Sequence, residues 1–125
     1  QLQKAVVRYM KMQHKDVFVN GSLGGVYIAS ARHRSYKAKG YQAGFPDLFV
    51  YSPRIVEGEY ISGLAIELKV KGNYPSENQK KVIGILNANG YLAVVCTGLD
   101  ETIERIEWYL SCTIPQADVN YTIKE

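Results

Sequence analysis

Two acidic residues and a lysine stand in an order that could support chemistry on a phosphate. Asp47 follows Gly44-Phe45-Pro46 and opens the apolar run 47–51, while Glu67 and Lys69 lie at the end of a second apolar run. Two carboxylates that converge on one point repel each other unless a cation lies between them, and hard oxygen ligands suit Mg²⁺ or Mn²⁺. A nearby lysine would attract phosphate or lower the pKa of an attacking water. Together these groups are the ones needed to hydrolyse a phosphodiester.

Two strands must position these side chains. Side chains alternate between the two faces of a strand. The second run therefore presents Glu67 and Lys69 on one face and buries the aliphatic residues of the other parity, which are Leu64, Ile66, Leu68 and Val70. The connection 52–62 is rich in turn residues, which predicts a hairpin with a longer loop. If the two strands pair antiparallel, Asp47 meets Glu67 and Lys69.

Each part of this pattern has a simpler explanation. Glu-x-Lys is common on exposed strand faces of soluble proteins, and Pro-Asp is more often a turn than a ligand. Their order, separation and strand context favour the site.

Four ordered motifs in this chain resemble the P-D…(D/E)-x-K nuclease superfamily, and within it the virus-type replication-repair nuclease (VRR-NUC) family. The matching stretches are 39–48 (KGYQAGFPDL), 66–69 (IELK), 76–79 (SENQ) and 89–91 (NGY), the last leading into an apolar strand. The resemblance implies that Asp47 and Glu67 bind the metal, that Lys69 serves catalysis and that Gln79 completes the site. It also implies that the backbone carbonyl of Leu68 is a metal ligand.

The chain departs from the family pattern at its first helix. The family usually carries an acidic residue there, just before the position that Gln3 matches. Two alternatives stay open: the acid lies upstream of Gln1, or Gln1 or Gln3 takes its place.

Cationic residues suggest where nucleic acid would bind. Residues 30–40 are expected to form a helix that ends at Gly40, with Tyr36 and Tyr41 nearby. Cations contact phosphates without reading sequence, and aromatic rings stack on unpaired bases. An exposed helix with ordinary charges is the alternative for this segment, as exposed lysines are for the helix that follows Ser76. The predicted DNA-binding residues are Arg32, Arg34, Lys37, Lys39, Lys71, Lys80 and Lys81.

Ser76 and Gln79 fit a capping box at the start of a helix, with a hydroxyl at the N-cap and glutamine three residues later. Capping alone would explain both residues. A role of Gln79 in the site therefore rests mainly on the family resemblance.

The net charge of +3 conceals an asymmetry. Residues 1–41 hold eight Lys or Arg against one acid, a net of +7, whereas the remaining residues hold seven bases and eleven acids, a net of −4. Such a distribution suits a surface that meets a polyanion. For the first helix alone, a solvated face is an equally good explanation.

The composition of 125 residues, 46% of them apolar, fits one globular domain over 1–125 with a C-terminal arm at about 112–125. No run approaches the roughly 20 apolar residues that span a bilayer, so we expect an intracellular protein of a phage, a bacterium or its host, without a membrane partner. Cys96 and Cys112 are expected to be buried free thiols. His14 and His33 are isolated in the sequence, and neither is assigned a ligand role.

The remaining periodicities complete the order of elements. They predict an amphipathic helix over 1–14, a short strand at 17–19, either a strand or a lead-in at 26–28, a strand at 91–97 covered on both faces, and a last helix with Asp100 as its candidate N-cap. Acids at 101, 104 and 107 decorate that last helix. The fold class is an α/β sandwich around a mixed sheet, the restriction-endonuclease-like core of the superfamily.

These features favour a metal-dependent, structure-selective DNA endonuclease. The viral type of the family implies a homodimer that acts on branched DNA such as four-way (Holliday) junctions. The alternatives are a monomeric nuclease for flaps or single strands, and a non-catalytic DNA-binding module that retains the fold.

Overall fold

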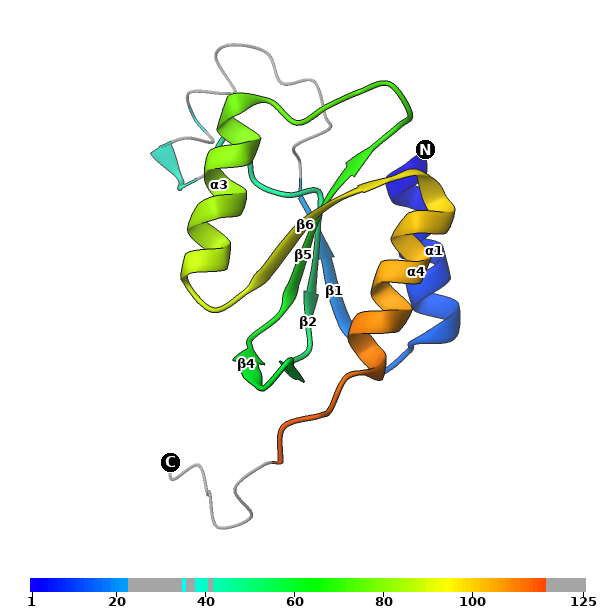
Figure 1. The fold of residues 1–125 in the computed structure, drawn as a ribbon. Coiled ribbons are helices and arrows are strands. Elements are labelled where there is room, and N and C mark those ends of the chain that lie inside the picture. Colours follow the sequence, from blue (N-terminus) through cyan, green and yellow to red (C-terminus); the bar gives the residue numbers. More distant parts are fainter. Residues whose placement is uncertain (23–34, 36–37, 41, 117–125) are drawn as a thin grey trace.

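The computed structural model describes residues 1–22, 35, 38–40 and 42–116. The predicted strand at 26–28, most of the helix over 30–40 and the residues after 116 lie outside this range, as do Arg32, Arg34 and Lys37. The elements are α1 (Leu2–Gln13), β1 (Phe18–Gly21), β2 (Leu48–Tyr51), β3 (Arg54–Val56), β4 (Glu59–Ile61), β5 (Leu64–Lys69), α3 (Glu77–Ala88), β6 (Leu92–Thr97) and α4 (Gly98–Ser111) (Figure 1).

The main sheet is mixed, as the sequence predicts. Its strand order is β1-β2-β5-β6; the first two pairings are antiparallel, and β5 pairs with β6 in parallel. Helix α3 connects these two parallel strands, because parallel strands need a crossover. The connection places the start of α3 at the same end of the sheet as the end of β5 (Figure 1).

The sheet is covered on both faces, so the molecule has three layers. Helices α1 and α4 lie on one face and α3 on the other (Figure 1). The larger core lies under α1 and α4, and a smaller cluster of Phe49, Ala65 and Ala93 packs with residues of α3. The buried members of the larger core are Val6, Met10, Leu48, Val50, Leu64, Ile66, Cys96, Ile106 and Tyr109.

The prediction that β5 buries four aliphatic residues on one face is wrong for its last member. Leu64 and Ile66 are fully buried, but Val70 is 54% exposed because the strand ends at Lys69. The opposite face is not open either. Since α3 covers it, Ala65 is buried and the carboxylate of Glu67 is only 2% exposed.

The connection between the two motif strands is not a simple loop. It contains a second, two-stranded sheet, in which β3 and β4 pair antiparallel around Glu57 and Gly58. Both turn residues have positive φ, +50° and +83°, which suits the twist of a tight hairpin. The buried guanidinium of Arg54 holds this hairpin to the body of the protein, since it donates to Ser52 Oγ at 2.6 Å and to the Leu110 carbonyl of α4 at 3.3 Å.

The helices follow the predicted pattern with one shift. Helix α4 begins at Gly98 with Thr97 as N-cap, so the prediction of Asp100 as the cap is wrong. The Glu101 carboxylate reaches back and accepts from the Thr97 N–H at 2.7 Å. This bond gives a backbone N–H at the start of the helix a partner, so the helix begins before Asp100.

Beyond α4, Thr113 pairs with Ile55 of β3 and so ties the start of the expected arm to the hairpin. Cys96 is buried and Cys112 partly buried, both as free thiols. No helix within the described ranges is long and apolar enough to cross a membrane.

Candidate active site

The antiparallel pairing of β2 and β5 brings Asp47 and Glu67 together. The register pairs Leu48 with Ile66. Asp47, which precedes Leu48, therefore lies beside Glu67, which follows Ile66. The Asp47 carboxylate, 9% exposed, accepts from the Leu68 N–H at 2.8 Å through Oδ2. The convergence predicted from the alternation of the two strands is therefore present.

Glu67 is the centre of this cluster. Its Oε2 accepts from Gln79 Nε2 at 2.9 Å and lies 3.4 Å from Lys69 Nζ. Its Oε1 is buried without a hydrogen-bond partner among the described residues. A buried oxygen in that state is costly, so something with positive charge or a proton is needed there.

The electrostatics of Glu67 agree with this need. Burial, followed by the charge of the adjacent Asp47 carboxylate, raises the pKa of Glu67 from 4.5 to about 7, although Lys69 acts in the opposite direction. A carboxyl group in this state exchanges its proton near neutral pH, where a cation can compete for the same oxygen.

The donor set fits a hard divalent cation. Within the described part of the chain, no group of three or more His, Cys, Asp and Glu side chains forms a metal cluster. The two carboxylates are thus the acidic donors available at this site. Mg²⁺ is commonly held by one or two carboxylates while it keeps several waters, so a pair is sufficient for an ion of that kind.

Gln79 reaches the cluster from the first turn of α3. Its Oε1 accepts from the Ser76 N–H at 2.8 Å, the Ser76 Oγ accepts from the Gln79 N–H at 3.2 Å, and its Nε2 donates to Glu67. Gln79 therefore takes part both in the capping box and in the contact with Glu67, two roles that the sequence leaves as alternatives.

The VRR-NUC domain family model matches residues 2–100 of this chain. The chain belongs to the VRR-NUC family. A solved structure described as a VRR_NUC domain protein is 30% identical in sequence and superimposes with a TM-score of 0.73, over 90% of this chain and 88% of that one. No curated protein matches the chain.

Membership in the VRR-NUC family implies a nuclease-type, DNA-processing function. The matched residues span every element from α1 to the start of α4 and include Asp47, Glu67, Lys69 and Gln79. The likeness to the solved VRR_NUC structure also confirms the mixed α/β fold.

A glycine of the VRR-NUC motif also shapes the site, a role that sequence reasoning missed. Gly44 has φ +84°, and a Cβ placed on it would lie 2.7 Å from the backbone carbon of Asn78 in α3. The loop before Asp47 therefore packs directly on the helix turn that carries Gln79. The signal in the sequence is the glycine three residues before Asp47.

The two glutamines at the start of α1 lie near this end of the sheet without joining the carboxylates. Gln3 donates through Nε2 to the Ser22 carbonyl at 3.4 Å, and the Ser22 N–H in turn donates to the Asp47 carbonyl at 2.9 Å. Gln1 is exposed and lines a surface groove. In the described residues, Gln3 thus supports the backbone next to Asp47.

Four of the seven predicted DNA-binding residues are described, and all four are exposed: Lys39, Lys71, Lys80 and Lys81. Lys71 lies two residues beyond Lys69, the last residue of β5, and Lys80 and Lys81 follow Gln79 in α3. Lys80 lies 3.4 Å from Glu77 in an exposed ion pair, which is a weak interaction.

His14 is not isolated in the structure. Its Nε2 lies 2.6 Å from Glu107 Oε2, which also accepts from the Tyr9 hydroxyl at 2.5 Å. Glu107 is therefore more than a surface acid, because it joins the end of α1 to α4. The residues are far apart in sequence, so no local pattern predicts the contact.

Proposed function

We propose that this protein is a metal-dependent DNA endonuclease that hydrolyses phosphodiester bonds in branched DNA such as four-way junctions. The observation that carries the proposal is the buried Glu67 carboxylate, which faces Asp47, contacts Lys69 and Gln79, and has one oxygen without a partner among the described residues.

Asp47 and Glu67 would hold Mg²⁺ or Mn²⁺, with the Leu68 carbonyl as a further ligand. The ion would polarise the phosphate and lower the pKa of a bound water. Asp47 also accepts from the Leu68 N–H, and this bond fixes the backbone of Leu68 beside the carboxylate pair.

Lys69 would neutralise negative charge that develops on the phosphate or assist removal of a proton from the water. Its ammonium lies 3.4 Å from Glu67 Oε2, so it is already in the site and is held by the same carboxylate. Gln79 would keep Glu67 in one orientation, because its own orientation is fixed by the bond to Ser76.

Seven cationic residues would bind phosphates and position DNA without reading its sequence. We include the described Lys39, Lys71, Lys80 and Lys81, and also Arg32, Arg34 and Lys37, in this set. A homodimer would supply the two active sites that paired cuts across a four-way junction require.

A non-catalytic DNA-binding module is the second candidate. The observation that favours it is that Gln3 of α1 bonds to the Ser22 carbonyl, and that among the described residues no third acidic side chain joins Asp47 and Glu67. Binding of DNA that does not depend on metal and is never followed by cleavage would support this reading.

The deciding experiment measures cleavage of labelled four-way junction, flap and linear duplex DNA with Mg²⁺, Mn²⁺ or EDTA. The matched control is Glu67→Gln, which keeps the size of the side chain and removes its charge. Metal-dependent cutting of the junction that disappears in the variant is the expected result. Cutting of flaps alone would mean that the substrate is a flap rather than a junction. Cutting that persists in Glu67→Gln would overturn the assignment of Glu67 to the active site.

A further inference from the structure

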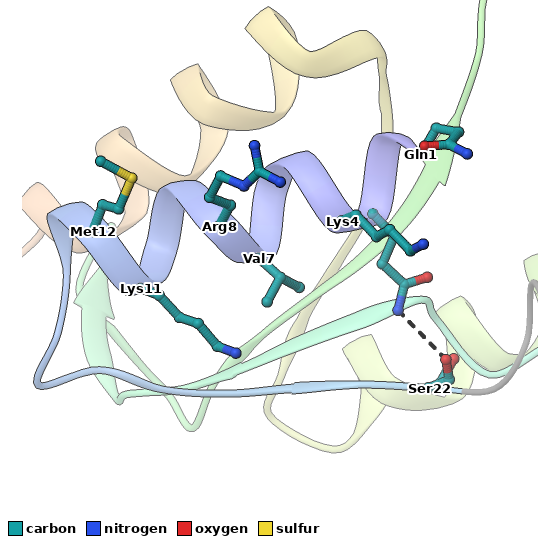
Figure 2. Close-up of a pocket in the computed structure, with 8 residues that line it drawn as sticks. Gln1, Lys4, Val7, Arg8, Lys11, Met12 and Ser22 are labelled. Carbon is teal, nitrogen blue, oxygen red and sulfur yellow. Dashed lines mark hydrogen bonds between the residues drawn. The ribbon is translucent and has the colours of Figure 1, made fainter.

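A groove of about 750 Å³ runs along the exposed side of α1, outside the carboxylate cluster (Figure 2). Three of its lining residues are cations, Lys4, Arg8 and Lys11, which repeat at spacings of four and three. Residues at such spacings share one side of a helix. The opposite side of α1 carries the buried Val6 and Met10, so the cationic side is the one left for a partner.

The charge of this groove is unbalanced. Its lining residues include no Asp or Glu, and none of the three cations forms a salt bridge with a described residue. The groove also has an apolar part, Val7 and the 64% exposed Met12. Lysine and arginine stems can lie along such a surface while their charged ends remain in water. An extended polyanion is the class of partner that matches this chemistry.

The position of the groove connects it to the proposed site. One end is formed by Gln1, Gln3 and Ser22, and the Ser22 N–H donates to the Asp47 carbonyl at 2.9 Å. Figure 2 shows the cations spread along α1, with Ser22 near the end at which the helix begins. The end of the groove at Ser22 therefore adjoins the backbone of Asp47, which places the groove beside the proposed site.

The spacing also fits a nucleic-acid strand. From Lys4 to Lys11 the helix rises about 10 Å at about 1.5 Å per residue. One strand of duplex DNA advances about 3.4 Å per phosphate along its axis, so this length faces about three phosphates.

We propose that the α1 groove binds the phosphate backbone of one substrate strand next to the scissile bond, through Lys4, Arg8 and Lys11. This inference rests on the proposed function for the identity of the substrate. It adds a second DNA contact surface to the one expected around Lys71, Lys80 and Lys81.

The test measures binding of labelled duplex and four-way junction DNA in EDTA at several salt concentrations. Each of Lys4→Gln, Arg8→Gln and Lys11→Gln should lower the slope of log affinity against log salt by about one, and the triple variant by about two to three. Glutamine has nearly the same helix propensity as lysine and arginine, so α1 should persist. The control is Lys15→Gln, which removes the same charge from an exposed residue outside this groove and should leave the slope unchanged.

The outcomes separate this inference from the proposed function. Normal cleavage together with an unchanged salt slope in the triple variant would overturn the inference alone. Binding that weakens as expected in a protein that cuts no DNA would support the groove and overturn the endonuclease. A triple variant that only dissociates a dimer, measured by sedimentation, would assign the groove to a second copy of the chain. Failure of the unsubstituted protein to bind DNA would overturn both proposals.

Discussion

Gln79 joins Glu67 to the backbone of Ser76 through the two ends of one carboxamide. Nε2 donates to the Glu67 carboxylate at 2.9 Å, and Oε1 accepts from the Ser76 N–H at 2.8 Å. The amide cannot rotate without losing both bonds. Folding of the first turn of α3 therefore fixes the orientation of the carboxylate on β5.

This relationship predicts different effects for two substitutions in the same capping box. Ser76→Ala removes the hydroxyl that caps α3 and should cost about 1 kcal/mol of unfolding free energy. Gln79→Ala should cost about as much stability, and should also slow cleavage about ten- to a hundredfold because a bond to a charged group is lost. Urea unfolding and single-turnover cleavage measure the two quantities. Equal cleavage rates in both variants would leave Gln79 with a capping role alone.

Lys69 is expected to act in the chemical step rather than in folding. Lys69→Ala should reduce cleavage to background while the melting temperature and most of the DNA affinity are retained, since the ammonium contacts a single carboxylate oxygen. Lys71→Ala is the matched control, because it removes the same charge from an exposed neighbour and should affect binding more than turnover. Continued turnover of Lys69→Ala would remove the lysine from the mechanism.

The raised pKa of Glu67 predicts how stability and metal binding depend on pH. Since burial and Asp47 raise this pKa from 4.5 to about 7, the folded chain binds the proton more tightly than the unfolded chain. The resulting contribution to stability is complete below pH 4.5 and is lost as pH rises through about 7. A cation binds the ionised carboxylate, so it should restore stability above that pH.

Melting temperatures with and without Mn²⁺, below and above the Glu67 pKa of about 7, check this linkage. The metal-induced rise should be large above that pH and small below it, and Asp47→Asn should abolish it. Glu67→Gln is the control that lacks the titrating group. An equal metal-induced rise in melting temperature at both pH values would mean that the ion does not bind the ionised Glu67 carboxylate.

Gly44 allows a test of how closely the loop before Asp47 must approach α3. Gly44→Ala should be destabilising by about 1–2 kcal/mol because of its positive φ, and by a further 1–3 kcal/mol or so because the new methyl group meets the Asn78 backbone. Gly58→Ala is a matched control, since Gly58 has nearly the same φ, +83°, and no atom within 4 Å of the added Cβ. Urea unfolding of the two variants should therefore differ, and the Gly44 variant alone should lose cleavage. Similar losses of stability would mean that the contact with α3 costs little.

The sequence predicts the parts of this site that depend on local periodicity. Alternation along 64–69 and the apolar run after Asp47 are sufficient to place both carboxylates at one end of paired strands. The pattern does not reveal the burial of Glu67. That depends on α3, which folds over the same face of the sheet and carries Gln79.

Contacts between distant elements account for most of what sequence reasoning missed. The β3–β4 hairpin is held by Arg54 bonds that reach α4, and short strands between turn residues resemble a loop. The start of α4 depends on Glu101, whose carboxylate bonds back to Thr97. In each case a side chain forms a hydrogen bond with a backbone group, and the pattern of apolar and polar residues along the sequence does not show which side chain does so.

The contact of Glu107 with Tyr9 and His14 predicts an acid-sensitive link between α1 and α4. Hydrogen bonds from Tyr9, then from His14, lower the pKa of Glu107 below 4.5, so this carboxylate stabilises the fold above pH 4.5 and loses that effect as pH falls through its lowered value. The Glu107 side chain is 44% exposed, so solvent weakens the interaction, and Glu107→Gln should cost about 1 kcal/mol near neutral pH. Glu104→Gln is the control, since it makes the same change at an exposed position of α4. Urea midpoints near neutral and at acidic pH should show that the difference between the two variants shrinks in acid; a difference that stays constant would mean that the loss comes from packing rather than from charge.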